Sequence, residues 1–332
     1  MSTAPKIAVV GGGSWATALV KILCEQLDYV GWWIRSKEQV DHIRMYHHNP
    51  RYLSSVELPT ELIDVHDDLE HIVSEADVLI FAIPSAFLKS SLSAYPDLDL
   101  SQKTVVSAIK GIVPDDRLIV GEYFHRHYSV PMDRIGVVTG PCHAEEVALE
   151  RLSYLTVASE SESLCQLISS SMECDYIRME QSDDIYGTEY AAVLKNVYAV
   201  AAGICHGLGY GDNFQAVLVS NAVRELKRFI KNVHPIKRDI TDSAYLGDLL
   251  VTTYSQFSRN RLFGNMIGKG YTIRSAQMEM NMVAEGYYAS RLVEMIRSDN
   301  DIKMPVARAV HRILYEGKGP RKTIAALAQK IH

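Results

Sequence analysis

A glycine-rich turn near the N-terminus constrains the fold more than any other feature of the sequence. The residues Gly11-Gly12-Gly13-Ser14-Trp15-Ala16 follow the apolar run Lys6–Val10 and open a helix-forming stretch from Trp15 to Leu27. They fit G-x-G-x-x-G/A, in which the first glycine permits a tight turn, the second lets the backbone approach a pyrophosphate, and the third small residue allows close helix packing. Because this strand–turn–helix context is right, the sequence predicts a dinucleotide-binding unit rather than a plain glycine turn.

The first half of the chain alternates short β-rich runs with helical stretches. After the first strand, apolar runs bounded by turns occur at Tyr29–Ile34, Val78–Ile83, Thr104–Ile109, Ile135–Thr139 and Tyr154–Ala158. Apolar runs separated by helices are typical of a buried parallel sheet with helices on both faces. The sequence therefore predicts an α/β, Rossmann-like N-terminal domain with a doubly wound, mainly parallel sheet.

The character of the chain changes after about Ser182. Helix formers with apolar residues at i, i+3 and i+4 recur, and no run there resembles a strand. The predicted helices are Ile185–Cys205, Phe214–Asn232, Ser243–Phe257, Ala284–Arg297 and Val306–Glu316. We expect a dinucleotide-binding domain over residues 1–184 and an all-α substrate-binding and catalytic domain over residues 185–332, with the first helix linking them.

Charge and cysteine content exclude several classes of protein. There are 34 Lys and Arg against 40 Asp and Glu, a formal charge of −6, which is unfavourable for nucleic-acid binding. The longest apolar runs, Val78–Ile83 and Val197–Cys205, are short for a membrane span, and the N-terminus does not resemble a secretory signal. Five widely spaced cysteines without Cys-x-x-Cys fit a reducing cytoplasm, and the twelve scattered histidines suggest no metal site.

Two isolated charges lie within apolar helical stretches. Lys195 is the only charged residue from Tyr190 to Cys205. Burial would lower the pKa of its amine and make it usable as a base or acid near neutral pH, although a lysine whose stem merely covers apolar surface fits the pattern equally well. Asp248 is similarly isolated, and a buried carboxylate needs a partner, for which Lys195 is a candidate. A structural ion pair or a helix cap is the alternative for Asp248.

Two further segments could contact an anion. In Ser258-Arg259-Asn260-Arg261, Ser258 is a candidate helix N-cap, so the following side chains and free backbone N–H groups could converge on a phosphate. A plain capping turn with solvated arginines explains the same residues. Lys110 follows the run Thr104–Ile109, and doubly wound sheets bind ligands at the carboxyl ends of their strands.

Arg35 bears on the choice of nicotinamide cofactor. NAD-specific sites usually place an acidic residue at the end of the second strand, whereas this chain has Arg35 there and no acid before Glu38. Arg35 could pair with a 2′-phosphate or stack on adenine, so we expect NADPH to be at least accepted. A solvated arginine at a strand end is the alternative.

Taken together, these residues resemble the bacterial-type NAD(P)-dependent glycerol-3-phosphate dehydrogenases, nearly from end to end. The segments that carry the resemblance are Gly11–Leu19, Asn49–Leu53, Ser107–Ile112, Gly140–Glu145, Leu194–Val197, Gly207–Asn213, Leu246–Leu249, Ser258–Arg261 and Val283–Gly286. Two positions depart from the family pattern. Ala16 replaces the usual glycine, which the motif tolerates, and Cys142 stands where Ser or Thr is usual, so the family's side-chain hydroxyl is absent there while a backbone contact would survive.

The resemblance implies roles for individual residues. Lys195 would be the catalytic base, positioned by Asp248. The implied substrate contacts are Lys110, Gly140, Cys142, Lys195, Asp248, Ser258, Arg259 and Asn260. The implied cofactor contacts are Gly11, Gly13, Ser14, Trp15, Arg35, Tyr52, Lys110, Ala144, Arg259, Val283 and Glu285.

The resemblance also implies a reaction, namely reversible hydride transfer between NAD(P) and C2 of sn-glycerol 3-phosphate, giving dihydroxyacetone phosphate. The family supplies glycerol 3-phosphate for phospholipid synthesis, and a homodimer is expected. Two alternatives remain open at this point. One is a β-hydroxyacid dehydrogenase of similar two-domain architecture, which would need a carboxylate-binding group. The other is a nicotinamide-binding redox sensor without turnover, which should lack an isolated lysine such as Lys195.

Overall fold

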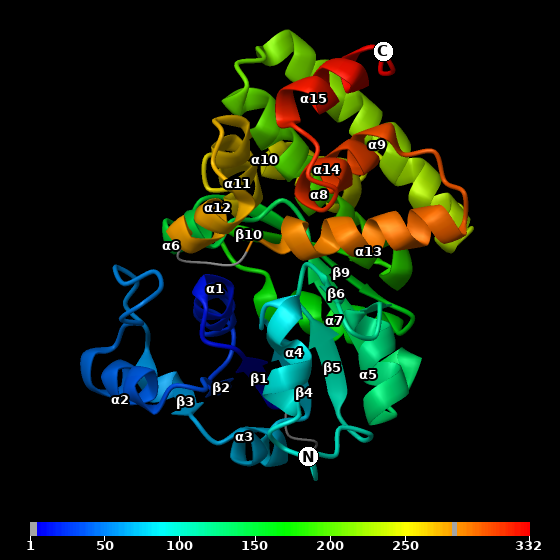
Figure 1. Ribbon diagram of the computed structural model, residues 1–332. Helices are drawn as coiled ribbons and strands as arrows, with labels where there is room; N and C mark the ends of the chain where they lie inside the picture. Colours follow the sequence, from blue (N-terminus) through cyan, green and yellow to red (C-terminus); the bar gives the residue numbers. More distant parts are fainter. Residues whose placement is uncertain (1–4, 281–283) are drawn as a thin grey trace. The chain divides into compact units, whose positions relative to one another are not determined.

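The computed structural model describes residues 5–280 and 284–332. It divides into two compact units (Figure 1). The sheet unit comprises Met1–Ile109 and Leu118–Ile185, and the helical unit comprises Lys110–Arg117 and Tyr186–His332. The short segment that carries Lys110 thus clusters with the helices, which the sequence pattern did not indicate. Val283, an expected cofactor contact, lies outside the described residues.

The sheet unit is built on one mainly parallel sheet. Within the described residues this sheet has eight strands in the order β10-β9-β8-β5-β4-β1-β2-β3. The strands are β1 (Ile7–Val10), β2 (Val30–Trp33), β3 (Ile63–His66), β4 (Val78–Phe81), β5 (Thr104–Ser107), β8 (Ile135–Thr139), β9 (Ser153–Ser159) and β10 (Ile177–Ser182). The pair β8–β9 is antiparallel and the other pairs are parallel. The predicted Rossmann-like fold class is confirmed.

Helices alternate with these strands along the chain (Figure 1). They are α1 (Ser14–Leu23), α2 (Lys37–Tyr46), α3 (Leu69–Glu75), α4 (Ser85–Leu92), α5 (Val120–Tyr128), α6 (Ala144–Ala148) and α7 (Glu162–Met172), with short 3₁₀ turns at Thr60–Leu62 and Met132–Arg134 and a two-residue strand β7 (Leu118–Ile119). The apolar side chains of α1, such as Leu19 and Ile22, share one buried core with Val9 and Trp32 of the sheet. This packing fixes the glycine turn between β1 and α1.

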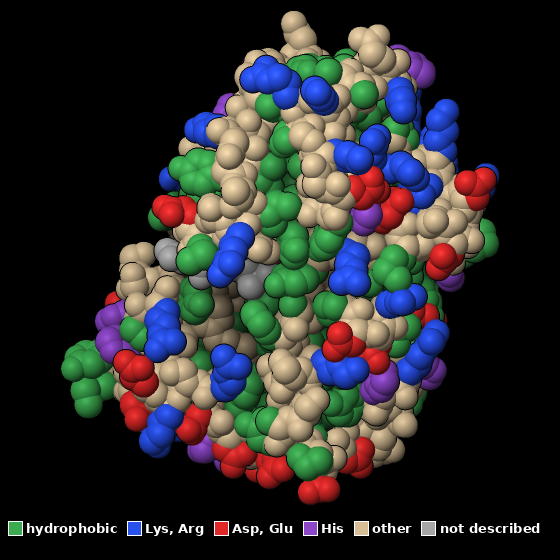
Figure 2. Space-filling model, viewed as in Figure 1, with side chains coloured by type: hydrophobic (Ala, Val, Ile, Leu, Met, Phe, Trp, Pro, Cys, Tyr) green, Lys and Arg blue, Asp and Glu red, His purple; other side chains and the backbone are tan. Residues whose placement is uncertain are grey.

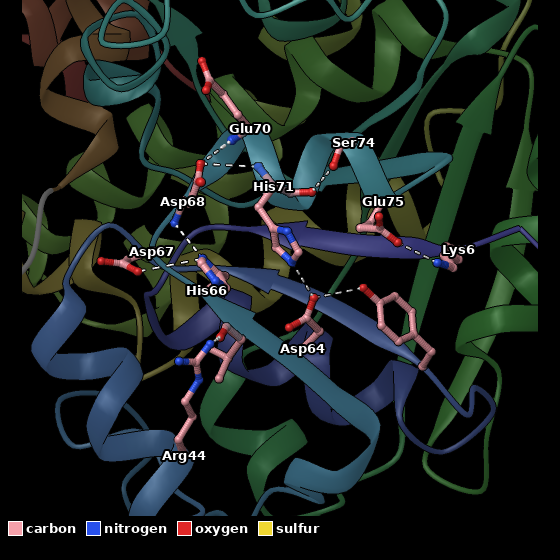
Figure 3. A network of polar contacts seen from close by, with 12 residues as sticks. Lys6, Arg44, Asp64, His66, Asp67, Asp68, Glu70, His71, Ser74 and Glu75 are labelled. Atoms are coloured by element: carbon pink, nitrogen blue, oxygen red, sulfur yellow. Dashed lines mark hydrogen bonds and ion pairs between the residues drawn. The ribbon is translucent and has the colours of Figure 1, made fainter.

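The edge strand β3 is an element that the sequence did not predict. Its buried residues Ile63 and Val65 alternate with partly exposed Asp64 and His66, so no continuous apolar run marks it. Polar groups surround this edge (Figure 3), where Asp64 accepts a hydrogen bond from the Tyr29 hydroxyl at 3.2 Å. Polar cover is how natural sheets protect an exposed edge from pairing with another chain.

The helical unit carries the remaining helices. They are α8 (Ile185–Gly207), α9 (Asp212–Val233), α10 (Asp248–Tyr254), α11 (Arg259–Gly268), α12 (Ile273–Glu279), α13 (Glu285–Asp299), α14 (Pro305–Leu314) and α15 (Pro320–Ala328), together with the two-residue strand β6 (Ile112–Val113). The predicted helices at 185–205, 214–232, 284–297 and 306–316 are confirmed within a few residues. The predicted helix Ser243–Phe257 is wrong in detail, because its first turn, Ser243–Gly247, is a π-helix and α10 ends at Tyr254. Helices α12 and α15 were not predicted.

Glycines bring the backbones of α8 and α11 into direct contact. A Cβ atom added at Gly203 of α8 would lie 2.0 Å from the carbonyl oxygen of Arg261. In the other direction, a Cβ added at Gly264 of α11 would lie 2.2 Å from the carbonyl oxygen of Val200. No side chain fits at either position, so the helix that carries Lys195 is held closely against the helix that begins after Ser258.

Charged side chains are distributed over the surface in Figure 2, and the described helices are of ordinary hydropathy. On the face shown in Figure 2, Lys and Arg side chains are scattered among acidic, apolar and neutral ones. Among the helices that the structure describes, none combines the length and the apolar character needed to cross a bilayer.

Candidate functional site

The glycine turn of the sheet unit has the shape that a dinucleotide phosphate requires. Gly11 has φ = +143°, and a Cβ there would lie 2.7 Å from the carbonyl oxygen of Ala82, so only glycine fits. Gly13 is the N-cap of α1, it provides no side-chain cap, and no atom lies within 4 Å of a Cβ added there. The turn therefore leaves room beside Gly13 at the positive end of α1, where Ser14 and Trp15 begin the helix. These observations fit a bound pyrophosphate.

Asn49 anchors this turn, a role that sequence reasoning missed. Its fully buried carboxamide donates to the Thr17 hydroxyl at 2.8 Å and to the carbonyl oxygen of Gly12 at 3.3 Å. Its oxygen accepts from the backbone N–H groups of Arg51 at 3.0 Å and Tyr52 at 3.3 Å. One side chain thus fixes the glycine turn relative to the loop that carries Tyr52. Only the resemblance drew attention to this Asn-Pro segment.

Arg35 lies beside the same turn. The N–H of Gly11 donates to the carbonyl oxygen of Trp33 at 3.0 Å, which places the end of β2 next to the turn. Arg35 follows two residues later and is exposed. Ser36 caps α2 by accepting from the Gln39 N–H. The guanidinium is therefore accessible at the carboxyl end of β2, where a 2′-phosphate contact was expected.

The end of β8 carries three more expected contacts. Gly140 has φ = +123°, and an added Cβ would lie 2.8 Å from the carbonyl oxygen of Tyr154, so this strand end packs closely against β9. Cys142 follows as a buried cysteine that forms no disulfide, and Ala144 begins α6.

In the helical unit, the carboxylate of Asp248 joins two lysines. Lys195 Nζ donates a short hydrogen bond to Asp248 Oδ1, and Lys110 Nζ lies 3.8 Å from Asp248 Oδ2. The side chains of Lys195 and Asp248 are only 5% and 2% exposed, whereas that of Lys110 is 20% exposed. Thr252 of α10 lies 3.4 Å from the same carboxylate through its hydroxyl. The two isolated charges of the sequence are therefore partners.

This cluster changes the proton affinity of Lys195. Burial, opposed by the Asp248 carboxylate and assisted by the neighbouring Lys110 cation, lowers the pKa of Lys195 from 10.5 to about 7. An amine with such a pKa can accept or donate a proton at neutral pH. The buried-amine interpretation of Lys195 thus fits the geometry better than a lysine whose ammonium reaches solvent.

The π-helical turn before α10 explains how Asp248 reaches this position. Residues Ser243–Gly247 form a π-helix directly before Asp248, which is the first residue of α10. A π-helical turn holds more residues than an α-helical one, so it rotates the following side chains relative to a regular helix. Such turns recur at functional sites, and this one lies next to a buried carboxylate.

The turn before α11 begins with the helix N-cap that the sequence predicts, Ser258. Ser258 is the N-cap of α11, and its hydroxyl accepts from the Arg261 N–H at 3.3 Å. Arg259 is exposed, while Asn260 is buried. The Asn260 carboxamide donates to Asn196 Oδ1 at 2.9 Å, so part of its hydrogen-bonding capacity is used within the protein.

Asn196 is a second residue that sequence reasoning left without a role. It follows Lys195 on α8, and its Nδ2 donates to the carbonyl oxygen of Lys110 at 2.8 Å. The backbone of Lys110 is thereby tied to the helix turn that carries Lys195. The sequence shows Asn196 only as a polar neighbour of the isolated charge on Lys195. Its hydrogen-bond partner, the carbonyl oxygen of Lys110, belongs to a segment far away in the chain.

The two units define a class of protein. Nicotinamide-dependent dehydrogenases typically combine two such features. One is a Rossmann-like sheet with a phosphate-binding turn, and the other is a helical unit with a buried lysine–carboxylate pair. Among residues 5–280 and 284–332, no group of three or more His, Cys, Asp or Glu side chains could hold a metal ion.

Comparison with known proteins gives the family. Residues 6–165 match the NAD-dependent glycerol-3-phosphate dehydrogenase N-terminus, and residues 184–325 match the NAD-dependent glycerol-3-phosphate dehydrogenase C-terminus. The chain belongs to this family. Glycerol-3-phosphate dehydrogenase [NAD(P)+] 2 of Salinibacter ruber is 36% identical over 328 residues, covering 98% of this chain and 94% of the relative. The Alcanivorax borkumensis glycerol-3-phosphate dehydrogenase [NAD(P)+] is 34% identical over 311 residues, covering 94% and 90%.

A solved structure agrees with the sequence relatives. The crystal structure of glycerol-3-phosphate dehydrogenase from Coxiella burnetii superposes with a TM-score of 0.90 at 28% identity, covering 98% of each chain. The similarity thus extends through both units and is not confined to the common dinucleotide-binding fold.

Proposed function

We propose that this chain interconverts sn-glycerol 3-phosphate and dihydroxyacetone phosphate with NAD(P). The observation that carries the proposal is the buried Lys195–Asp248 pair beside Lys110, because it provides an amine that titrates near neutral pH. The family membership fixes the reaction type to which such an amine contributes.

Lys195 moves the proton in both directions. In oxidation, the neutral amine of Lys195 accepts the proton of the C2 hydroxyl. In reduction, the ammonium form returns a proton to the oxygen that develops at C2. Bound NAD(P) supplies the acceptor or donor of the hydride. Asp248 holds Lys195 in place, and together with Lys110 it sets the proton affinity of the amine.

The substrate phosphate provides binding energy away from the reacting carbon. Arg259 is exposed at the start of α11, where a guanidinium and the first helix N–H groups suit a phosphate. We assign Ser258, Arg259 and Asn260 to this phosphate, and Lys110, Gly140 and Cys142 to the remainder of the substrate. Orientation by a remote phosphate brings C2 to Lys195 and raises the rate.

The cofactor assignment rests on the glycine turn and its neighbours. The room beside Gly13 at the start of α1 supports phosphate binding through Gly11, Gly13, Ser14 and Trp15. Exposed Arg35 supports acceptance of NADPH as well as NADH. We also assign to the cofactor Tyr52, Lys110, Ala144, Arg259, Val283 and Glu285.

We also propose domain boundaries, a cellular location and an oligomeric state for this chain. Residues 1–184 would be the dinucleotide-binding domain and residues 185–332 the helical substrate-binding and catalytic domain. The five cysteines form no disulfide, which supports a cytoplasmic location. The family resemblance supports a homodimer and a role in supplying glycerol 3-phosphate for phospholipid synthesis.

Oxidation of NADPH and NADH in the presence of dihydroxyacetone phosphate tests the proposal. Turnover with this substrate, and none with a β-ketoacid of similar size, is the expected result. Turnover with the β-ketoacid alone would establish a β-hydroxyacid dehydrogenase instead. Tight NADPH binding without turnover of either substrate would indicate a redox sensor.

A further inference from the structure

A chain of side-chain amides links three helical segments of the helical unit. The N–H of Gly286 donates to Asn260 Oδ1 at 2.8 Å. Asn260 Nδ2 donates to Asn196 Oδ1 at 2.9 Å, and Asn196 Nδ2 donates to the carbonyl oxygen of Lys110 at 2.8 Å. Every bond in this chain points the same way, from α13 to Lys110. Hydrogen bonds in such a series polarise one another, so each bond is stronger than it would be alone.

The first link caps α13 from another helix. The N-cap residue of α13 is Ala284, whose side chain cannot accept a hydrogen bond, and Gly286 is the second residue of that helix. Its N–H therefore belongs to the first turn, whose amides have no partner within the helix. Asn260 of α11 supplies the missing acceptor, and this bond is buried.

The same junction has no spare room. A Cβ added at Gly286 would lie 2.5 Å from the carbonyl oxygen of Asn196 and 2.8 Å from Val200 Cγ2. Real Cβ atoms essentially never approach other atoms within 3.0 Å. The start of α13 thus rests directly on the turn of α8 that carries Lys195 and Asn196.

We propose that Gly286 is a positioning residue for the dehydrogenase reaction, because its bare backbone lets the amide chain through Asn260 and Asn196 hold Lys110 in register with Lys195. This inference rests on the proposed function. Any side chain at residue 286 moves the start of α13 away from α8, breaks its bond to Asn260, and loosens the carbonyl of Lys110.

The variant Gly286→Ala isolates this effect. Gly286 is not among the glycines with positive φ, so alanine can adopt its backbone conformation, and alanine is the better helix former. A loss of activity would then come from the close contact with Asn196 and not from backbone strain. We expect kcat to fall by about 10- to 100-fold, because displacements on the order of 1 Å have such effects on catalysis.

Gly268→Ala is a matched control. An added Cβ there would lie 2.4 Å from the carbonyl oxygen of Ile204, so the crowding is as severe, but Gly268 lies at the opposite end of α11 from Asn260. We expect this control to lower the melting temperature while preserving kcat. A purely structural role for Gly286 predicts the same behaviour in both variants.

Combination with Asn196→Ala tests the linkage. If Gly286 acts through the amide chain, the kcat of the double variant Asn196→Ala/Gly286→Ala should be nearly that of whichever single variant has the lower kcat. Losses that multiply in the double variant would overturn the inference. In the cofactor-free protein, exchange of the Gly286 amide hydrogen should be slow in the wild type and faster in Asn196→Ala. Equal exchange rates would also contradict the linkage.

The outcomes separate this inference from the proposed function. Absence of turnover by the wild-type enzyme would reject the proposed function and the inference with it. Wild-type turnover together with an unchanged kcat in Gly286→Ala would overturn the inference alone.

Discussion

Lys195 and Asp248 lie 53 positions apart in the sequence and form an ion pair that is almost completely withdrawn from solvent. A buried pair of this kind contributes little net stability, because desolvation of both charges offsets their attraction. Its value here is chemical. The pair and nearby Lys110 keep the pKa of Lys195 at about 7, between that of a free lysine and that of an amine buried alone.

The pH dependence of the reaction follows from this pKa. In the proposed mechanism, oxidation of glycerol 3-phosphate uses the neutral amine, so its kcat/KM, which reports the pKa of the free enzyme, should fall about tenfold per pH unit below about pH 7 and level off above it. Reduction of dihydroxyacetone phosphate would use the ammonium form, so its kcat/KM should fall as pH rises through the same region. Steady-state kinetics from roughly pH 5.5 to about pH 9, a range that extends to both sides of the pKa of Lys195, would check both reactions. Profiles that bend in the same direction would contradict the assigned proton transfer.

Two substitutions should move this titration in opposite directions. Asp248→Asn removes the carboxylate that raises the pKa of Lys195, so the midpoint should shift below 7. Lys110→Met removes the neighbouring cation that lowers it, so the midpoint should shift above 7. The midpoint of the kcat/KM profile for glycerol 3-phosphate in each variant is the quantity to measure. Shifts of the same sign would mean that Lys195 does not control the profile.

Arg35 should discriminate between the two cofactors. Its guanidinium can form two charge-assisted hydrogen bonds to a 2′-phosphate, worth roughly 1.5–3 kcal/mol, or about 10- to 150-fold in affinity. Arg35→Ala should therefore raise the KM for NADPH much more than that for NADH. Arg126→Ala, an exposed arginine of α5, is the control. An unchanged NADPH/NADH ratio of kcat/KM would show that Arg35 does not contact the 2′-phosphate.

Asn49 should affect cofactor binding without touching the proton chemistry. Asn49→Ala releases the loop of Arg51 and Tyr52 from the glycine turn, and the loss of even one buried hydrogen bond corresponds to about a tenfold change in affinity. We expect a higher Kd for NADPH in fluorescence titrations and an unchanged pH midpoint for the kcat/KM of glycerol 3-phosphate. Asn300→Ala, at the exposed end of α13, provides the comparison. Equal Kd values in the two variants would confine Asn49 to a structural role.

The fold was predictable wherever local chemistry determines it. The glycine turn, the buried parallel strands and four long helices each have a periodicity or a steric requirement that acts over a few residues. The edge strand β3 escaped prediction because polar residues alternate along its four positions. The π-helical turn Ser243–Gly247 escaped because its residues fit an ordinary helix equally well.

The candidate site was predictable in part. Lys195 and Asp248 stood out because each is a single charge in an apolar helix. The roles of Asn49, Asn196 and Gly286 depend on partners that are distant in the chain, such as the carbonyl oxygen of Lys110. An amide or a glycine has no charge to mark it as unusual, so only the tertiary structure shows what it contacts.

The sharpest test of the proposed proton transfer by Lys195 is the kcat of the Lys195→Met variant. Methionine keeps an unbranched apolar side chain but cannot take up a proton, and Lys231→Ala on the exposed surface of α9 serves as the control. We expect a loss of at least ~10²-fold in kcat in both directions, with the Kd for NADPH and the circular dichroism spectrum preserved. A folded Lys195→Met enzyme with wild-type turnover would contradict this proposal.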